Sequence, residues 1–175
     1  MNLQVQPEAM GNGGWLSVGG QRFRCAMGRG GVVGSAEKRE GDGGTPAGLW
    51  PLRRLLFRPD RLAPPATGLP IRPIRPLDAW GDAPGDEAYN RPTLWPRATS
   101  IERLWRDDRL YDLVVVVGHN DDPVVAGAGS AIFLHVARPD YGPTEGCVAL
   151  ALADLIVAVA LAGPDDAVNI AQAAT

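Results

Sequence analysis

Short apolar runs separated by glycine- and proline-rich stretches dominate the hydrophobic pattern of this chain. Trp15 to Val18 and Arg22 to Met27 are two strand-like runs on either side of Gly19-Gly20, a dipeptide suited to the tight turn of a β-hairpin. Leu49 to Phe57 is a further strand-like run with a proline near its start, which is best tolerated at a sheet edge. Leu113 to Val117 (LVVVV) is the most strand-like run, and we expect it at the centre of the sheet.

Two segments favour helix. Ser100 is a suitable N-cap for a short helix through about Asp108, in which Ile101, Leu104 and Trp105 would share one face. Ala151 to Ala162 fits a second helix, which Gly163-Pro164 would end, and Val168 to Ala171 fits a last strand. Many turn residues separate these elements, so the pattern predicts a mainly β fold with one or two short helices.

The segment 58–76 is rich in proline, and the fixed φ and missing amide protons of proline exclude helix interiors and central strands. We therefore expect a stiff, partly polyproline-like cover on the surface of the protein. Its alternative role is a lid that restricts access to a cleft, because long loops in compact domains are often functional. Residues 78–92 (DAWGDAPGDEAYNRP) are expected to form another ordered loop.

Composition and charge narrow the class of protein. The 175 residues, 45% hydrophobic and 21% charged, suit one domain spanning 1–175, and we expect a monomer. A net charge of −3 and the lack of a long basic run argue against a nucleic-acid partner and favour a small soluble or peptide substrate. No apolar run is long enough for an integral membrane segment, and the opening residues lack a secretory signal pattern.

The stretch 129–150 (GSAIFLHVARPDYGPTEGCVAL) carries the candidate chemistry. Ala131 to Leu134 fits a buried strand that ends at His135, where the side chain would meet solvent, and a loop then leads to Cys147. A thiolate is the reactive form of cysteine, and both an imidazole and the N-terminus of the predicted helix after Cys147 would favour it. Gly146 would let a substrate carbonyl approach backbone N–H donors. The alternative interpretation is a structural cysteine beside a core histidine.

A coupled thiol and imidazole would also affect the dependence of the rate on pH. The rate would depend on two apparent pKa values belonging to the pair, and a flat profile from pH 5 to 9 would argue against the pair. A disulfide between Cys25 and Cys147 would block this chemistry, so we expect Cys25 to be a small core residue.

The residues IFLH followed by TEGCVAL resemble the signature of the L,D-transpeptidase (YkuD-type) catalytic domain. The upstream pattern K-x-EGD-x-x-TP-x-G agrees and is carried by Lys38, Glu40, Gly41, Asp42, Thr45, Pro46 and Gly48. The resemblance implies a β-sandwich or barrel-like domain that cuts an L,D bond in a peptidoglycan stem and transfers the acyl group to an amine such as that of diaminopimelate. It implies donor and acceptor stem peptides as partners, the periplasm or cell envelope as location, and no metal or cofactor.

The resemblance also assigns roles. Cys147 would form a thioester with the donor stem, and His135 would activate the thiol and then protonate the leaving amine. The N–H groups of Gly146 and Cys147 would bind the oxyanion. Thr144 takes the place of the motif's Ser/Thr, and its hydroxyl or carbonyl would orient the imidazole.

Two positions depart from the family pattern. Glu145 stands where the motif has histidine, and Ala149 stands where an arginine usually follows the cysteine, so the donor stem is expected to differ. Arg138 is a candidate replacement for that arginine, unless it is a solvated loop cation. The remaining candidate substrate contacts are Asn90, His119 and Tyr141, although a capping or surface role is the simpler one for His119.

The proline-rich segment resembles a compact branch of the family that joins L-Ala of one stem to diaminopimelate of another, a 1,3-type cross-link. Two alternatives remain. The thioester would pass to water in an L,D-carboxypeptidase or endopeptidase, and a non-catalytic module would only bind the cell wall.

Overall fold

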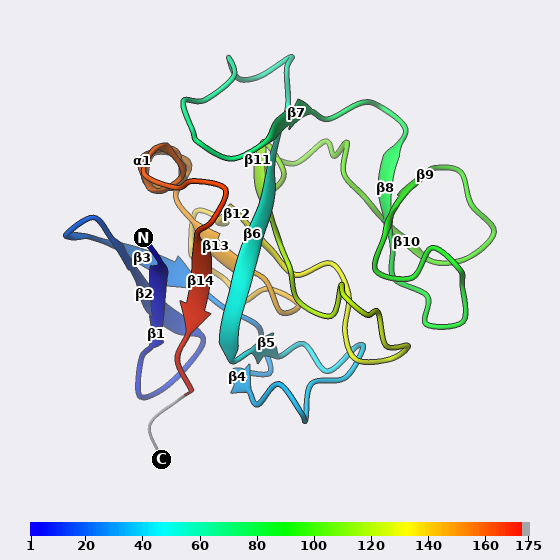
Figure 1. Ribbon diagram of the computed structural model, residues 1–175, viewed down its shortest axis with the longest axis horizontal. Coiled ribbons are helices and arrows are strands. Elements are labelled where there is room, and N and C mark those ends of the chain that lie inside the picture. Colours follow the sequence, from blue (N-terminus) through cyan, green and yellow to red (C-terminus); the bar gives the residue numbers. More distant parts are fainter. Residues whose placement is uncertain (173–175) are drawn as a thin grey trace.

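A closed β-barrel forms the centre of the computed structural model, which describes residues 1–172 (Figure 1). Its eight strands pair in the order β11-β12-β13-β3-β2-β1-β14-β6, and β6 pairs back with β11. Two pairs in the ring, β1 with β14 and β12 with β13, are parallel, so the barrel is mixed. The strands are β1 (Leu3–Pro7), β2 (Gly13–Val18), β3 (Gln21–Ala26), β6 (Gly48–Phe57), β11 (Leu113–Val117), β12 (Phe133–Val136), β13 (Val148–Leu150) and β14 (Ala167–Ile170).

The side chains of β11 point alternately into two hydrophobic clusters. Leu113, Val115 and Val117 belong to the barrel core, whereas Val114 and Val116 belong to a second cluster outside the barrel. Successive residues of a strand face opposite sides of the sheet, and here both sides are covered. This explains why the run LVVVV is apolar at every position. In a closed barrel β11 has no central place, but it is paired on both sides as expected.

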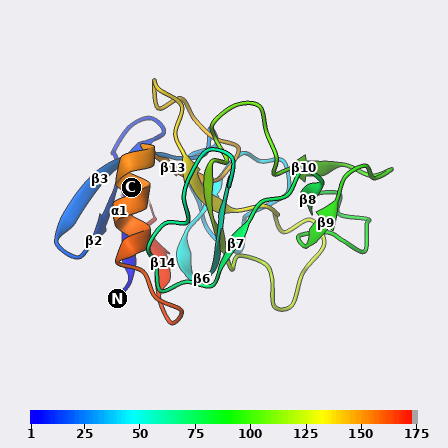
Figure 2. The ribbon, with the colours of Figure 1, turned by 90° about the horizontal axis from the view of Figure 1, so that it is seen from above.

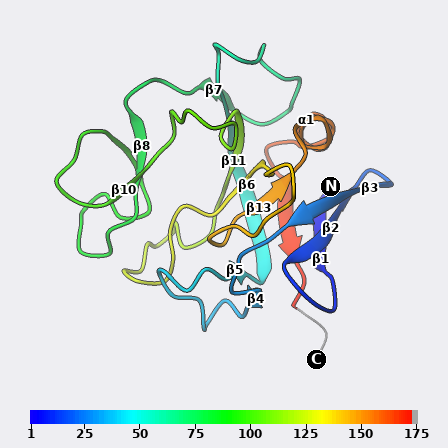
Figure 3. The same ribbon diagram turned by 180° about the vertical axis from the view of Figure 1, so that it is seen from behind.

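A small second sheet covers the outer cluster. It consists of β8 (Asp78–Gly81) flanked by β9 (Pro92–Leu94) and β10 (Ile101–Arg103), and it lies on the side of the barrel opposite β2 and β3 in all three views (Figures 1–3). Trp80 and Leu104 from this region pack with Phe133 of β12. The barrel wall and the side sheet therefore enclose a second, smaller core.

The predicted helix from Ser100 to about Asp108 is wrong. Residues 101–103 pair with β8 instead, and the N–H of Leu104 donates to the carbonyl of Asp78. Leu104 is buried in the outer cluster, so tertiary packing outweighs the local preference for helix. The prediction of a loop over 78–92 fails at its start for the same reason, since residues 78–81 form β8.

The remaining predicted strands and the second predicted helix form where the hydrophobic pattern places them, but β6 does not have the neighbours that we expected. The hairpin at Gly19-Gly20 and the last strand are confirmed, and the second predicted helix is α1 (Leu152–Ala160). The expectation of a sheet edge at Pro51 is wrong, because β6 is paired on both sides. The pairing of β6 with β11 is irregular between Val116 and Val117, close to Pro51, which has no backbone N–H to donate. No helix among the described residues is long and apolar enough to cross a membrane.

The proline-rich segment 58–76 lies along one end of the barrel. It contains β7 (Ile71–Pro73), which pairs in parallel with β6, and the N–H of Gly68 donates to the carbonyl of Ala162 just after α1. Arg58 is buried and stacks on Trp105 at 3.9 Å. These contacts fix the segment against the barrel. The two shortest strands, β4 (Val32–Val33) and β5 (Thr45–Pro46), form a separate parallel pair.

Candidate active site

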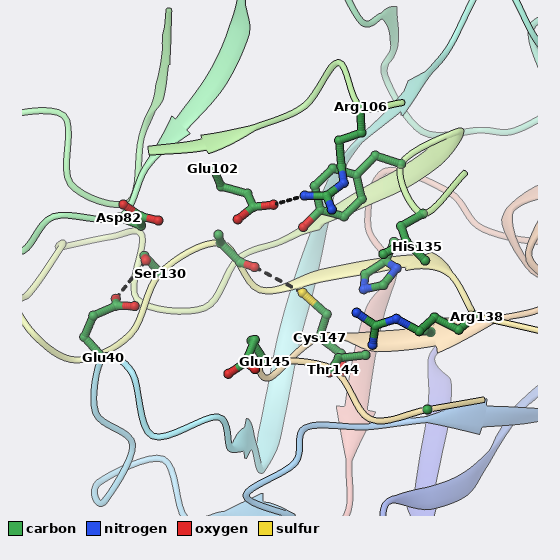
Figure 4. Close-up of a pocket in the computed structure, with 15 residues that line it drawn as sticks. Glu40, Asp82, Glu102, Arg106, Ser130, His135, Arg138, Thr144, Glu145 and Cys147 are labelled. Atoms are coloured by element: carbon green, nitrogen blue, oxygen red, sulfur yellow. Dashed lines mark hydrogen bonds and ion pairs between the residues drawn. The ribbon is translucent and has the colours of Figure 1, made fainter. Parts of the chain in front are cut away.

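A cavity of about 330 Å³ contains both Cys147 and His135 (Figure 4). Its walls come from the barrel and from the region of the side sheet. The barrel contributes His135, Ala149 and the chain just before β12 and β13, and the other wall contributes Asp82, Glu102 and Arg106. The structure therefore brings together the two residues singled out as the reactive pair.

His135 lies within β12, not at its end. Leu134 and Val136 point into the barrel core, so His135 points outward with Phe133. The side chain is 6% exposed, which corrects the expectation that it meets solvent. Its Nδ1 lies 2.9 Å from the carbonyl oxygen of Val136. A carbonyl can only accept, so Nδ1 carries the proton and Nε2 is left as an acceptor. The ring of Tyr111 packs against the imidazole at 5.3 Å.

Cys147 stands directly before β13, and four residues, three of them in β13, separate it from α1. The expected position at a helix N-terminus is therefore wrong, and the helix dipole does not act on this thiol. The Sγ atom is 3.2 Å from the carbonyl of Ala131, to which it donates, and 3.4 Å from the N–H of Phe133, which donates to it. Figure 4 shows the thiol facing the cavity between the charged residues.

Burial opposes charge on both members of the pair. It raises the pKa of the Cys147 thiol to about 12 and lowers the pKa of the His135 imidazole to about 4. In the free protein the resting pair is therefore a neutral thiol and a neutral imidazole over the range from pH 5 to 9. A buried pair of this kind predicts a rate that is level from pH 5 to 9. A flat profile in that range therefore does not argue against the pair, contrary to the expectation from the sequence.

We expect alkylation of Cys147 by iodoacetamide to be slow at neutral pH and to accelerate as the pH rises. The reason is that iodoacetamide, which the site does not align with His135, reacts with the thiolate, and a pKa raised to about 12 keeps the thiol protonated. Peptide mass spectrometry of the native protein over a pH series measures the rate. Rapid labelling that is independent of pH between 6 and 9 would show that the thiolate already exists in the free protein.

Thr144 holds the backbone around the cysteine. Its hydroxyl donates to the carbonyl of Cys147 at 2.6 Å and accepts the N–H of Gly146 at 3.1 Å. Its carbonyl accepts the N–H of Arg29 at 2.8 Å. The hydroxyl and the carbonyl are thus both engaged with groups other than His135. The carbonyl of Val136, not Thr144, orients the imidazole in this structure.

The upstream motif K-x-EGD-x-x-TP builds the loop beneath Gly146. Buried Lys38 donates to the carboxylate of Asp42 at 2.5 Å, and Asp42 accepts the N–H groups of Arg39 and Gly44. A Cβ on Gly146 would lie 2.8 Å from the carbonyl oxygen of Gly44, and φ is +130° at Gly146. The motif and the segment 144–147 therefore fit together only with glycine at position 146.

Gly28→Ala is expected to destabilise the protein by about 3 kcal/mol. A Cβ at this position would stand 2.1 Å from the carbonyl oxygen of Gly43 and 3.0 Å from the Cα of Gly146, and both are backbone atoms that cannot rotate away. Urea unfolding measures the loss. Gly85→Ala is the matched control, because its Cβ would meet nothing within 4 Å and the change should be nearly neutral. Equal stabilities of the two variants would contradict the close packing at Gly28.

Three further candidate residues lie in or at the rim of the cavity. Arg138 donates to the carbonyl of Pro143 at 2.8 Å, and Figure 4 shows its guanidinium beside Cys147. Exposed Glu145 accepts from Nε of Arg29 at 2.8 Å. Ala149 is the register partner of His135 on the neighbouring strand. An arginine at position 149 would therefore stand beside the imidazole, and Arg138 approaches the same region from the loop.

The remaining three candidates do not line this cavity in the described part of the chain. Asn90 is buried, accepts from Trp80 and from the N–H of Ala131, and donates to the carbonyl of His119, so it ties loops together. His119 lies in a different hollow, where Nε2 is 3.0 Å from the carbonyl of Ala128. The ring of Tyr141 packs under the guanidinium of Arg24. All three have structural contacts instead.

The wall opposite the thiol was not found from the sequence. It includes Tyr111, Arg106 and several carboxylates, which come from segments without a recognisable spacing. Arg106 donates to Glu102 at 2.9 Å and to Asp108 at 2.6 Å, and its guanidinium lies over the ring of Tyr111. Only Glu40 had a signal, as part of the upstream motif.

Comparisons with known proteins identify the family of this chain. The family model described as the L,D-transpeptidase catalytic domain (YkuD) matches residues 12–170, which include both motifs and every strand of the barrel except β1. Neither a curated protein nor a solved structure matches the chain. The chain therefore belongs to the YkuD family of L,D-transpeptidase catalytic domains, which are cysteine acyltransferases that act on peptidoglycan stem peptides.

Proposed function

We propose that this protein is a single catalytic domain in which Cys147 and His135 transfer an acyl group from one peptidoglycan stem to an amine of another. The observation that supports this best is the presence of both buried side chains in one cavity of a chain that belongs to this family. Because polymerised peptidoglycan lies outside the cytoplasm, the proposal places the enzyme in the cell envelope.

The geometry suggests how the thioester forms. Nε2 of His135 takes the thiol proton as Sγ attacks the donor carbonyl, and the N–H of Phe133 stabilises the developing thiolate. The imidazolium then gives its proton to the amine that leaves as the C–N bond breaks. The N–H groups of Gly146 and Cys147 would donate to the oxyanion. The N–H of Gly146, which now donates to the hydroxyl of Thr144, would then be shared between that hydroxyl and the oxyanion.

For the donor, we propose the bond after L-Ala, which leads to 1,3-type cross-links. Ala149 and Glu145 support a donor that differs from the usual one, because they change the charge and size of the wall beside the reactive pair. Arg138 would bind the donor carboxylate in place of the absent arginine. The proline-rich segment adds no support, since none of residues 58–76 lines the described cavity.

The test is incubation of the protein with purified muropeptides, followed by tandem mass spectrometry of the products. Dimers joined from L-Ala to diaminopimelate would support the whole proposal. Dimers joined between two diaminopimelate residues would keep the transpeptidase and overturn the donor assignment. Shortened stems without dimers would identify water as the acceptor, as in an L,D-carboxypeptidase or endopeptidase.

A further inference from the structure

Charged side chains divide the cavity into two sides. Figure 4 shows Arg138 and His135 on one side of Cys147, and Glu40, Asp82 and Glu102 on the other. The transfer reaction needs two ligands at the thiol, a donor that carries a carboxylate and an acceptor that carries an amine. At neutral pH a primary amine is a cation, so the acidic side has the complementary charge.

We propose that Asp82 and Glu102, supported by Glu40, bind the protonated amine of the acceptor before transfer. This inference rests on the proposed function and adds an acceptor site to it. Such a site favours aminolysis of the thioester over hydrolysis, because it concentrates and orients the amine beside the reacting carbonyl.

Asp82 gives the most direct support. Its side chain lines the cavity, and one of its two carboxylate oxygens, Oδ1, is buried and has no hydrogen-bond partner among residues 1–172. A buried acceptor without a donor is costly, and most such atoms in proteins are paired. A primary ammonium has three N–H donors and one positive charge, so it can pair with the Asp82 carboxylate and with a neighbouring carboxylate together.

Glu102 provides the neighbouring carboxylate. One of its oxygens accepts from Arg106 at 2.9 Å, but Arg106 also pairs with Asp108, so its single charge is shared between two carboxylates. Burial raises the pKa of Glu102, and the charge of Asp82 acts in the same direction. A bound ammonium would relieve both effects.

Glu40 is held rigidly at the edge of this group. Its Oε2 atom accepts from the hydroxyl of Tyr89 at 2.6 Å and from that of Ser130 at 2.7 Å. No cationic side chain in the described part of the chain pairs with Glu40 or Asp82, whereas the rim residue Glu145 is paired with Arg29. The acidic side therefore carries negative charge that the described protein does not neutralise.

The bound ammonium first loses one proton to solvent through the carboxylates. The free amine then attacks the thioester carbonyl, so that a C–N bond forms and the C–S bond breaks. The nitrogen gives a second proton to His135, and His135 returns it to the leaving Sγ of Cys147.

The test uses Asp82→Asn and Glu102→Gln, which remove charge with little change in shape. Glu87→Gln is the matched control, because Glu87 is a 92% exposed carboxylate between β8 and β9. Each variant is first given donor stem alone, and mass spectrometry measures the rate of thioester formation. The thioester is then offered either a tripeptide stem ending in diaminopimelate or hydroxylamine, which is uncharged at neutral pH.

We expect each site variant still to form the thioester, which also shows that it is folded, and the transfer step is then measured from the preformed thioester. The KM for the diaminopimelate stem should rise about tenfold, with more hydrolysis, while transfer to hydroxylamine stays unchanged. Glu87→Gln should behave as wild type. An unchanged KM, or equal losses with both acceptors, would overturn the acceptor site and leave the transpeptidase intact. Absence of thioester in the wild type would overturn both.

Discussion

Cys147→Ala is expected to abolish thioester formation and to lower cross-linking by at least about 10³-fold. No other described side chain in the cavity offers a comparable nucleophile in the position of Sγ, which is held between the carbonyl of Ala131 and the N–H of Phe133. The mass of the protein after incubation with donor stem shows the thioester, and chromatography of muropeptides shows the cross-linked product.

Cys25→Ala is the matched control. Cys25 is the other buried cysteine, it lies on β3 in the barrel core, and burial raises its pKa to about 12 as it does for Cys147. The two thiols therefore differ in position, while burial opposes the thiolate form of both. Cys25→Ala should lose about 1 kcal/mol of stability and keep its activity. Thioester formation in Cys147→Ala, or its loss in folded Cys25→Ala, would contradict the assignment.

Six of the eight barrel strands were predictable because they carry their information locally, whereas β1 and β13 were not expected from the sequence. The hairpin has its Gly-Gly turn, and β11 has apolar residues at every position because both of its faces are covered. The side sheet was not predictable in this way. Its strands have only three or four residues, and pairing with β8 determines the conformation of Ile101–Arg103. Such pairing is a property of the tertiary fold.

The same distinction applies to the site. Cys147 and His135 belong to a compact motif, so they can be identified from the sequence. Asp82 and Glu102 reach the cavity only because the side sheet folds over the barrel. Asn90 and His119 show the opposite error. They are polar residues with suitable chemistry, but their hydrogen bonds serve the loops next to β11 and β12.

The environment of the pair also differs from what the sequence suggested. A helix N-terminus after Cys147 would have favoured a thiolate, but β13 occupies that place and burial favours the neutral thiol. Reactivity then depends on proton transfer to His135 during attack, not on a preformed ion pair. Neutral reactants also cost less to bury than a thiolate and an imidazolium. Because the thiol is neutral at rest, the rate of thioester formation depends more strongly on His135 than it would with a preformed thiolate.

His135→Gln is expected to slow thioester formation by about 10²- to 10⁴-fold and to change its pH dependence. In the wild type, burial lowers the pKa of the imidazole to about 4, so the neutral base is present from pH 5 to 9 and the rate should be level. The rate should fall only as the pH approaches 4, where His135 becomes protonated. Without the base, the rate should follow the thiolate fraction and rise about tenfold per pH unit, because the pKa of Cys147 is raised to about 12.

His119→Gln separates this effect from the loss of any buried histidine. Burial lowers the pKa of His119 too, but this residue lies in another hollow against Trp50, away from the thiol. Its substitution should leave the level profile and the rate of thioester formation unchanged in folded protein. A His135→Gln variant whose rate stays level with pH would mean that another group takes the proton. Because the change of slope is measured within one variant, it does not depend on how much of that protein is folded at neutral pH.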